Sequence, residues 1–130
     1  AEVIYCKSLP EGYGVSYGHH YVSDGTGYIL TVAIGYADGV DRRIKDHKVY
    51  VGDEECTVVG TVCMDLMMVH SMKPHKVGEL VEIIGERITV EDRKDDYETC
   101  CCKVITDISD RVTRVYKKDN QVIAEIVERK

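Results

Sequence analysis

The chain has 130 residues, of which 44% are hydrophobic and 31% charged, with a formal net charge of −6. This length usually forms one core, so we expect a single domain over residues 1–130. An acidic chain lacks the clustered cations that bind a phosphate backbone, and no apolar run is long enough to span a bilayer. We therefore expect neither nucleic-acid binding nor membrane contact. The first residues, A-E-V-I-Y-C, lack an initiator Met and a signal pattern, which favours a domain cut from a longer protein.

Short runs of branched apolar residues, bounded by Gly, Asp or Asn, recur along the chain and are typical of strands separated by tight turns. The expected strands are residues 28–34, 48–51, 56–64, 79–84, 104–108, 112–117 and 121–127. Asp119 and Asn120 suit a hairpin turn between the last two. One short helix is expected from Thr89, whose hydroxyl can cap the first turn while Asp92 bonds back. These elements predict a mainly β fold, a closed Greek-key-like barrel with one short helix.

The six cysteines predict no metal site and no disulfide framework. They include three in a row and no C-x-x-C pair, so the spacings of zinc knuckles and ribbons are absent. We expect most of them to be buried thiols in a protein of the reducing cytoplasm.

Three polar clusters interrupt the apolar pattern, each next to a glycine. They are V-S-Y-G-H-H-Y at residues 15–21, I-G-Y-A-D-G-V-D-R-R at 34–43 and V-G-T-V-C-M-D at 59–65. A glycine that ends or interrupts a strand can leave polar side chains and bare N–H groups at a barrel rim. Each cluster is therefore a candidate site.

The first cluster has two interpretations. Tyr17 can present its phenol beyond a strand end as a proton acceptor, or it can be a half-buried tyrosine whose hydroxyl is satisfied locally. His19 and His20 are interpreted as solvated surface residues rather than metal ligands.

The other two clusters also have a plain structural interpretation. Asp38 and Gly39 need only form a turn, and Arg42 can bind a carboxylate or face water. Cys63 and Met64 look like core residues at the end of a strand, with Asp65 closing that strand. The functional alternative uses the backbone N–H of Met64 as an anion donor.

The series of motifs resembles the C-terminal domain of the bacterial alanine racemase family. V-S-Y-G-x-x-Y, I-G-Y-A-D-G-x-x-R-R, V-G-x-V-C-M-D-x-x-M-V, V-G-E-x-V-x-I-I-G, I-T-x-E and R-V-x-R-V-Y stand in family order and at family-like spacing, from Ser8 to Tyr116. Single blocks are only moderately specific, whereas six blocks in order are hard to reach by chance. The resemblance thus covers nearly the whole chain.

The resemblance implies a racemase that uses pyridoxal phosphate and works as a head-to-tail homodimer. In that family the cofactor sits on a lysine of an N-terminal TIM-type barrel, which this sequence lacks, so no cofactor and no activity are expected for the domain alone. V-S-Y-G makes Tyr17 the counterpart of the catalytic base that the partner subunit donates. Lysine and tyrosine then act on opposite faces of the substrate, one removing the α-proton and the other returning one.

The same resemblance implies contacts with a small amino-acid substrate. Met64 would offer its backbone N–H to the substrate carboxylate. Tyr36 and Arg42 would line the entry channel, while Cys63 and Asp65 would flank the carboxylate site.

Two positions depart from the family pattern. Thr61 stands where relatives often carry an arginine, so a charge of the entry channel is lost. An ungapped alignment places Cys102 where relatives carry a tyrosine near the cofactor phosphate; Tyr97 takes that place only with a later insertion. A cysteine leaves more room than a tyrosine, which predicts that serine is accepted as well as, or instead of, alanine.

Three functions follow as alternatives. The first is a domain of a cytoplasmic alanine racemase that supplies D-amino acids for the cell wall. The second is the racemase part of a serine racemase, whose parent in some relatives is anchored in the membrane. The third is a non-catalytic dimerisation or binding barrel, which the presence of Tyr17, Met64 and Asp65 disfavours.

Overall fold

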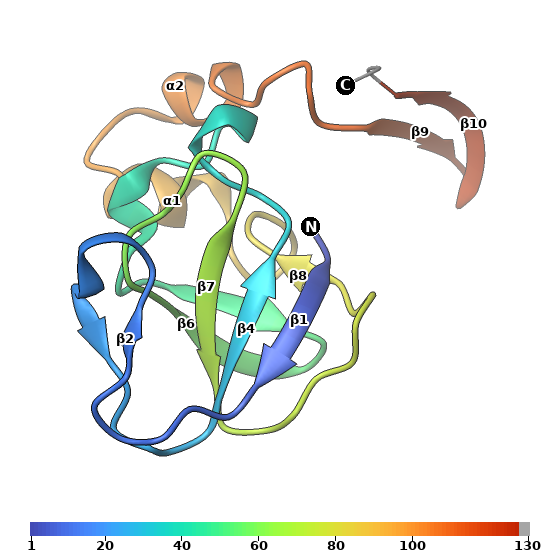
Figure 1. Cartoon of the computed structure of the whole chain (residues 1–130). Helices are drawn as coiled ribbons and strands as arrows, with labels where there is room; N and C mark the ends of the chain where they lie inside the picture. Colours follow the sequence, from blue (N-terminus) through green and yellow to red (C-terminus); the bar gives the residue numbers. More distant parts are fainter. Residues whose placement is uncertain (128–130) are drawn as a thin grey trace.

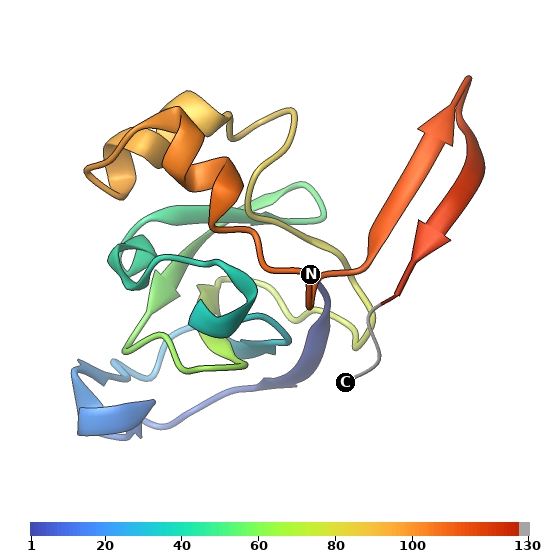
Figure 2. The ribbon, with the colours of Figure 1, turned by 90° about the horizontal axis from the view of Figure 1, so that it is seen from above.

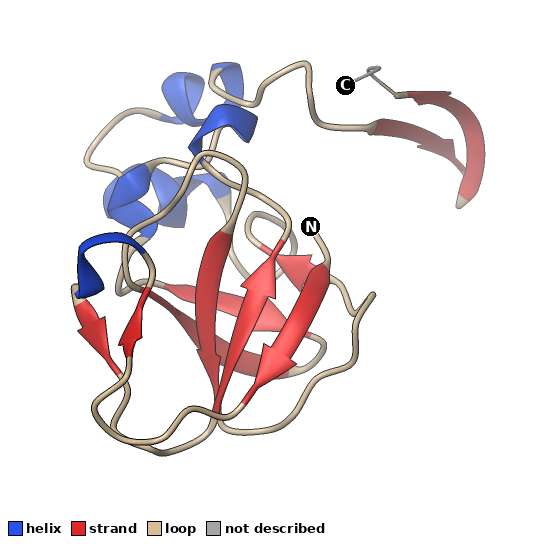
Figure 3. Cartoon of the chain, viewed as in Figure 1, coloured by secondary structure: helices blue, strands red, loops and turns tan. Residues whose placement is uncertain are grey.

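The computed structural model describes residues 1–127, and its centre is a curled six-stranded antiparallel sheet (Figures 1 and 3). The strand order is β1-β4-β7-β6-β5-β8. The strands are β1 (Val3–Lys7), β4 (Tyr28–Val32), β5 (Lys48–Val51), β6 (Glu54–Val59), β7 (Met67–Ser71) and β8 (Val81–Glu82). The predicted mainly β class is confirmed, although the sequence analysis assigned no strand to β1 or β7.

The two edges of this sheet meet through main-chain contacts. Glu2 forms a bridge with Leu80, and the N–H of Val3 donates to the carbonyl of Glu79 at 2.9 Å. The N–H of Gly78 in turn donates to the carbonyl of Val3 at 2.8 Å. The start of β1 therefore pairs with the segment leading into β8, which joins the sheet into a barrel and covers edges that would otherwise be open.

The barrel core follows the two-residue period of its strands. On β5, Val49 and Val51 are buried, whereas Lys48 is exposed. The buried members of the other main strands include Leu30, Val32, Cys56, Val58, Met67 and Val69. One face of each strand thus lines a continuous apolar interior.

Helix α1 (Val90–Asp96) begins as predicted. Thr89 Oγ1 accepts from the N–H of Asp92 at 3.2 Å, and Asp92 Oδ2 accepts from the N–H of Thr89 at 2.7 Å. The helix is tied to the barrel by Arg93, which is fully buried. Its guanidinium donates to the carbonyls of Ile83 and Lys48 at 2.8 and 2.6 Å and to Asp96 Oδ2 at 2.8 Å, so each of its three nitrogens has a partner and the buried charge is paired.

A second helix replaces an expected strand. Residues 104–108 were predicted to be extended, but α2 (Cys101–Thr106) covers most of them. Val104 is the only buried residue of α2, so the short apolar run reflects one inward turn of a helix rather than a strand. The prediction of one helix is therefore wrong, and three short 3-10 helices add to the count: η1 (Tyr17–His19), η2 (Tyr36–Asp38) and η3 (Arg42–Ile44).

The prediction for the cysteines is also wrong. Among the described residues only Cys56 is buried, Cys6, Cys63 and Cys101 are partly buried, and Cys100 and Cys102 are exposed. Three consecutive cysteines begin a helix that buries a single side chain, so most of their thiols face outward.

Several strand ends also differ from the prediction. The expected strand 56–64 is β6 and ends at Val59, because Gly60 adopts a left-handed φ of 70° and turns the chain. The strand 28–34 ends at Val32, and 79–84 contributes only the two residues of β8. The residues left over form the loops around the candidate site.

Two hairpins lie outside the main sheet. β2 (Gly14–Val15) pairs with β3 (Tyr21–Val22), and β9 (Arg114–Lys118) pairs with β10 (Gln121–Ile126). Asp119 and Asn120 form the second turn with φ of 49° and 61°, as predicted. Figure 2 shows the β9–β10 hairpin extending away from the barrel. Within residues 1–127, no helix has the length and apolar character needed to cross a membrane.

Candidate active site

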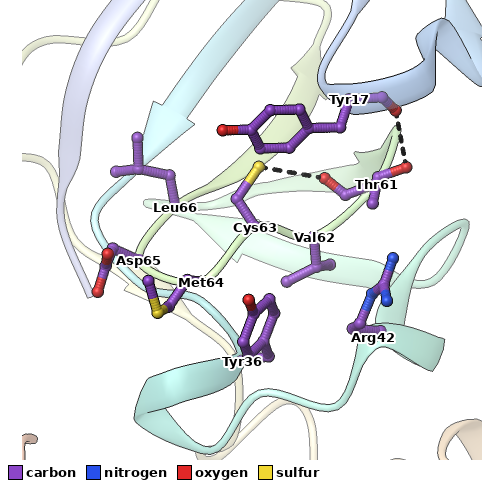
Figure 4. A pocket seen from close by; sticks show the side chains of 9 residues that line it. All are labelled: Tyr17, Tyr36, Arg42, Thr61, Val62, Cys63, Met64, Asp65 and Leu66. Atoms are coloured by element: carbon purple, nitrogen blue, oxygen red, sulfur yellow. Dashed lines mark hydrogen bonds between the residues drawn. The ribbon is translucent and has the colours of Figure 1, made fainter.

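The three polar clusters of the sequence converge on one pocket of about 570 Å³ (Figure 4). It lies between the tip of the β2–β3 hairpin, the segment after β4 and the loop between β6 and β7. Its lining consists of Tyr17, Tyr36, Arg42, Thr61, Val62, Cys63, Met64, Asp65 and Leu66. All predicted site residues except Cys102 are in this set.

Tyr17 stands on the surface at the tip of its hairpin, with 74% of the residue exposed. Ser16 has φ of 64° and Gly18 has φ of 73°, so the chain turns sharply on both sides of it. Such left-handed conformations turn the tyrosine away from the strand pair. The interpretation of Tyr17 as half-buried is therefore wrong.

The Tyr17 turn is fixed to the β6–β7 loop by hydroxyl groups. Thr61 Oγ1 donates to the carbonyl of Tyr17 at 3.0 Å, and Ser16 Oγ donates to the carbonyl of Thr61 at 2.5 Å. Ser16 Oγ also lies 3.4 Å from Cys63 Sγ. Thr61 thus anchors the main chain of Tyr17.

The β6–β7 loop presents Met64 at the pocket. Met64 is 51% exposed and Cys63 is only partly buried, so the prediction that both are core residues is wrong. The N–H groups of Tyr36 and Ala37 donate to the carbonyls of Cys63 and Met64, each at 3.0 Å. Within the described part of the chain, the N–H of Met64 makes no hydrogen bond, and it is available as an anion donor.

Gly35 is what allows this close approach. A Cβ built at Gly35 would lie 2.3 Å from the carbonyl oxygens of both Cys63 and Met64. Only a residue without a side chain permits such contact between two backbones. The glycine of G-Y-A-D-G therefore sets the position of the Met64 loop.

Asp65 leads to a network that sequence reasoning did not predict. It accepts a short hydrogen bond from Arg111, whose Nε also lies 3.6 Å from Asp38 Oδ1. The buried Asp38 accepts from the N–H of Gly35 at 2.9 Å. Arg111 therefore connects the two loops that form the pocket. Arg111 belongs to the motif R-V-x-R, but the sequence alone does not indicate that it pairs with Asp65 and Asp38, which lie 46 and 73 residues away.

Tyr36 and Arg42 complete the side of the pocket opposite Tyr17 (Figure 4). Tyr36 is 48% exposed, and Arg42 is the only cationic residue of the lining. Together with the N–H of Met64, the Arg42 guanidinium and the Tyr36 phenol offer a positive charge and hydrogen bonds to a small anionic group.

Cys102 is exposed on α2 and is not part of this pocket. The alternative, Tyr97, is 4% exposed at the end of α1, and burial raises its pKa to about 12. Tyr97 packs in the apolar core and does not line the pocket. His19 and His20 lie exposed beside Tyr17.

Comparison with known proteins identifies the fold and its family. The family described as "Alanine racemase, C-terminal domain" matches residues 1–116. The alanine racemase of Ligilactobacillus salivarius is 37% identical over 90% of this chain and 33% of its own length. That of Lactococcus lactis is 39% identical, again over 90% of this chain and 33% of its own length.

Solved structures agree with this assignment. Alanine racemase from Bacillus anthracis with bound L-Ala-P superposes with a TM-score of 0.93 at 34% identity, covering 97% of this chain and 34% of that one. Alanine racemase from Clostridium difficile gives a TM-score of 0.92 at 38% identity, covering 98% and 34%. The chain thus spans about one third of the length of the relatives it matches. By sequence and by fold, it belongs to the alanine racemase C-terminal domain family.

Proposed function

We propose that this chain is the C-terminal barrel of a pyridoxal-phosphate-dependent alanine racemase, and that it lends Tyr17 to the active site of a partner subunit in a head-to-tail homodimer. The observation that supports this most directly is the exposed Tyr17 side chain, standing on a turn fixed by Thr61 beside the free N–H of Met64. With 74% of the residue exposed, Tyr17 is accessible to a group held by another subunit.

The pocket fits one wall of a shared site. Among the described residues that line it there is no lysine, and we assign the amine that would hold pyridoxal phosphate to an N-terminal domain. When bound, pyridoxal phosphate delocalises the negative charge left after α-proton removal. Toward such a cofactor this chain would present the phenol of Tyr17, which can transfer a proton, and the N–H of Met64, which can donate a hydrogen bond.

Tyr17 moves a proton at the α-carbon of the amino acid. Its phenolic oxygen takes the proton from one face or returns one to it, while a lysine of the N-terminal domain acts on the opposite face. Removal on one face and return on the other inverts the configuration. The hydrogen bonds that hold the Ser16–Gly18 turn keep the phenol on one side of the substrate.

Met64 and its neighbours position the substrate. The N–H of Met64 donates to the substrate carboxylate and leaves the α-carbon beside the Tyr17 phenol. Arg42 attracts the substrate carboxylate at the entrance, while Asp65, held by Arg111, borders the carboxylate site. A small amino acid such as alanine has the carboxylate that these groups recognise.

A domain exchange tests this function. In the C. difficile alanine racemase, this chain would replace the C-terminal domain to which it is 38% identical. The chimera should racemise alanine, and Tyr17→Phe should lower kcat by about 10²- to 10⁴-fold, the usual contribution of a positioned acid or base. Tyr13→Phe is the matched control, because Tyr13 is a second exposed tyrosine of the same region, outside the pocket.

The result also separates an enzyme domain from a scaffold. A chimera that forms dimers but does not racemise alanine would favour a non-catalytic barrel. Equal kcat in Tyr17→Phe and Tyr13→Phe would refute the role of Tyr17.

A serine preference is the second candidate, and the exposed thiol of Cys102 favours it. Cys102 is accessible to another domain and smaller than the tyrosine of relatives. The chimera should then show a higher ratio of serine to alanine racemisation than its C. difficile parent, and Cys102→Tyr should lower that ratio. An unchanged ratio in Cys102→Tyr would remove this candidate and leave the alanine racemase proposal intact.

A further inference from the structure

A second polar cluster lies at the other end of strand β6 from the candidate active site. It consists of Glu54, Cys56 and His75, with Glu79 behind the histidine. β6 begins at Glu54, whereas the pocket loop follows its last residue. Six residues of strand span about 20 Å, so the cluster is remote from the proposed racemase chemistry and independent of it.

Three potential metal-binding atoms converge in this cluster. Glu54 and Cys56 are two residues apart on β6 and therefore point to the same face. His75 reaches them from the segment between β7 and β8, with Nε2 2.6 Å from Glu54 Oε2. The carboxylate, thiol and imidazole atoms all lie within 4.8 Å of one another.

The cluster is enclosed and its side chains are held in place. Cys56 is 3% exposed, and the side chains of His75 and Glu54 are 9% and 13% exposed. The Glu54 carboxylate also accepts from Ser71 Oγ and from the N–H of Met72, both at 2.8 Å. This arrangement differs from a patch of exposed acidic groups, because each donor atom has a fixed position in a nearly closed space.

Glu79 adds a feature that is typical of metal-binding histidines. Its Oε2 lies 2.7 Å from His75 Nδ1 and also accepts from the N–H of Lys76 at 2.9 Å. A carboxylate on the remote ring nitrogen fixes the tautomer and orientation of a metal-binding histidine and raises its basicity. His75 Nε2 is thereby directed at Glu54 and Cys56.

We propose that Glu54, Cys56 and His75 bind one zinc ion, with Glu79 orienting the His75 ring. Thiolate, imidazole and carboxylate are the ligands that Zn²⁺ takes in proteins, at about 2.0 to 2.3 Å. Tetrahedral coordination at those lengths separates neighbouring donors by about 3.3 to 3.7 Å. His75 Nε2 and Glu54 Oε2 then move apart by less than about 1 Å, and water completes the coordination.

Metal binding replaces protons with bonds to zinc. The Cys56 thiol proton and the proton between His75 and Glu54 pass to the buffer, and Zn–S, Zn–N and Zn–O bonds form without oxidation or reduction. The ion joins β6 to the β7–β8 segment, whose residue Leu80 pairs with Glu2 where the barrel closes. Zinc therefore stabilises the closed barrel.

Titration of the chelator-treated chain with Co²⁺, followed by Zn²⁺, tests the site. We expect one equivalent of Co²⁺ with a thiolate-to-metal absorption band, displacement by Zn²⁺, and a higher Tm with zinc. Cys56→Ser should abolish the band, and Glu79→Gln should weaken binding by about 10- to 100-fold. The matched control is the triple variant Cys100→Ser, Cys101→Ser, Cys102→Ser, which should keep the band because those thiols lie at the N-cap and in the first turn of α2.

Three outcomes would overturn the proposal. One is a folded wild-type chain that binds neither ion at micromolar concentration. Another is a band that survives in Cys56→Ser and vanishes in the triple variant, which would place the metal on α2. The third is an unchanged metal affinity in Glu79→Gln. Because the Glu79 side chain is accessible, this variant should fold and can test the proposal even if Cys56→Ser does not fold.

Discussion

The hydroxyl of Thr61 donates a hydrogen bond of 3.0 Å to the main-chain carbonyl of Tyr17, across 44 residues of sequence. It fixes the turn that carries the proposed base. Thr61→Val removes this bond while keeping the shape of the side chain. Because a neutral hydrogen bond contributes about 0.5–1.5 kcal/mol, kcat of the chimeric racemase should fall about two- to tenfold.

The matched control for this prediction is Thr57→Val. Thr57 is an exposed threonine on β6, outside the pocket. Its replacement should leave kcat unchanged, and Thr61→Val should lower the free energy of unfolding in urea by no more than about 0.5–1.5 kcal/mol. Equal kinetics for the two variants would show that Thr61 does not position Tyr17.

Gly35 gives a prediction about the Met64 loop. In Gly35→Ala the new methyl group would meet the carbonyls of Cys63 and Met64 at 2.3 Å, so the backbones must separate. We expect a loss of about 2–3 kcal/mol in the free energy of unfolding, measured in urea, and a raised KM for alanine in the chimera. Gly52→Ala is the control: it has open space around it and loses only about 1 kcal/mol through its φ of 55°.

Local sequence signals predicted the features of the fold that depend on neighbouring residues. The Thr89–Asp92 capping box and the Asp119–Asn120 turn formed as expected, because each involves residues at most three positions apart. The residues 104–108 were misassigned, since a short apolar run fits a strand or one helical turn equally well. The strand predicted at residues 56–64 is too long, because Gly60 was expected to interrupt the strand, whereas β6 ends just before it.

The pocket was predictable only as a set of separate motifs. The resemblance to a family named Tyr17, Tyr36, Arg42, Cys63, Met64 and Asp65, and the structure brings all six to one pocket. The links between them, Thr61 to Tyr17 and Arg111 to Asp65, join segments 44 and 46 residues apart. No local pattern encodes such pairs, because they depend on how the barrel brings its loops together.

Arg111 is predicted to stabilise both pocket loops. Arg111→Met keeps most of the side-chain length but leaves Asp65 and the buried Asp38 without this cation. Loss of a partner to a buried carboxylate should lower the free energy of unfolding by about 1–3 kcal/mol. Arg87→Met, which breaks an exposed ion pair with Asp53 and a partly exposed one with Glu82, should cost less than about 1 kcal/mol. Equal losses would mean that the Arg111 network is no more than a surface contact.

The buried Tyr97 should make the free energy of unfolding depend on pH in the alkaline range. Burial raises its pKa to about 12 in the folded chain, whereas an unfolded tyrosine ionises near pH 10. The folded state therefore holds this proton more tightly. The resulting stability is fully present below about pH 10 and is lost as pH rises toward 12. At pH 11 the loss is about 1.4 kcal/mol.

Tyr97→Phe removes the ionisable group and should remove this part of the pH dependence. Between pH 9 and pH 11, the free energy of unfolding in urea should fall about 1 kcal/mol further for the wild type than for Tyr97→Phe. Tyr13→Phe, which alters an exposed phenol, should follow the wild-type curve. Parallel curves for wild type and Tyr97→Phe would show that the Tyr97 hydroxyl reaches water in the folded domain, and that α1 does not seal it against the barrel.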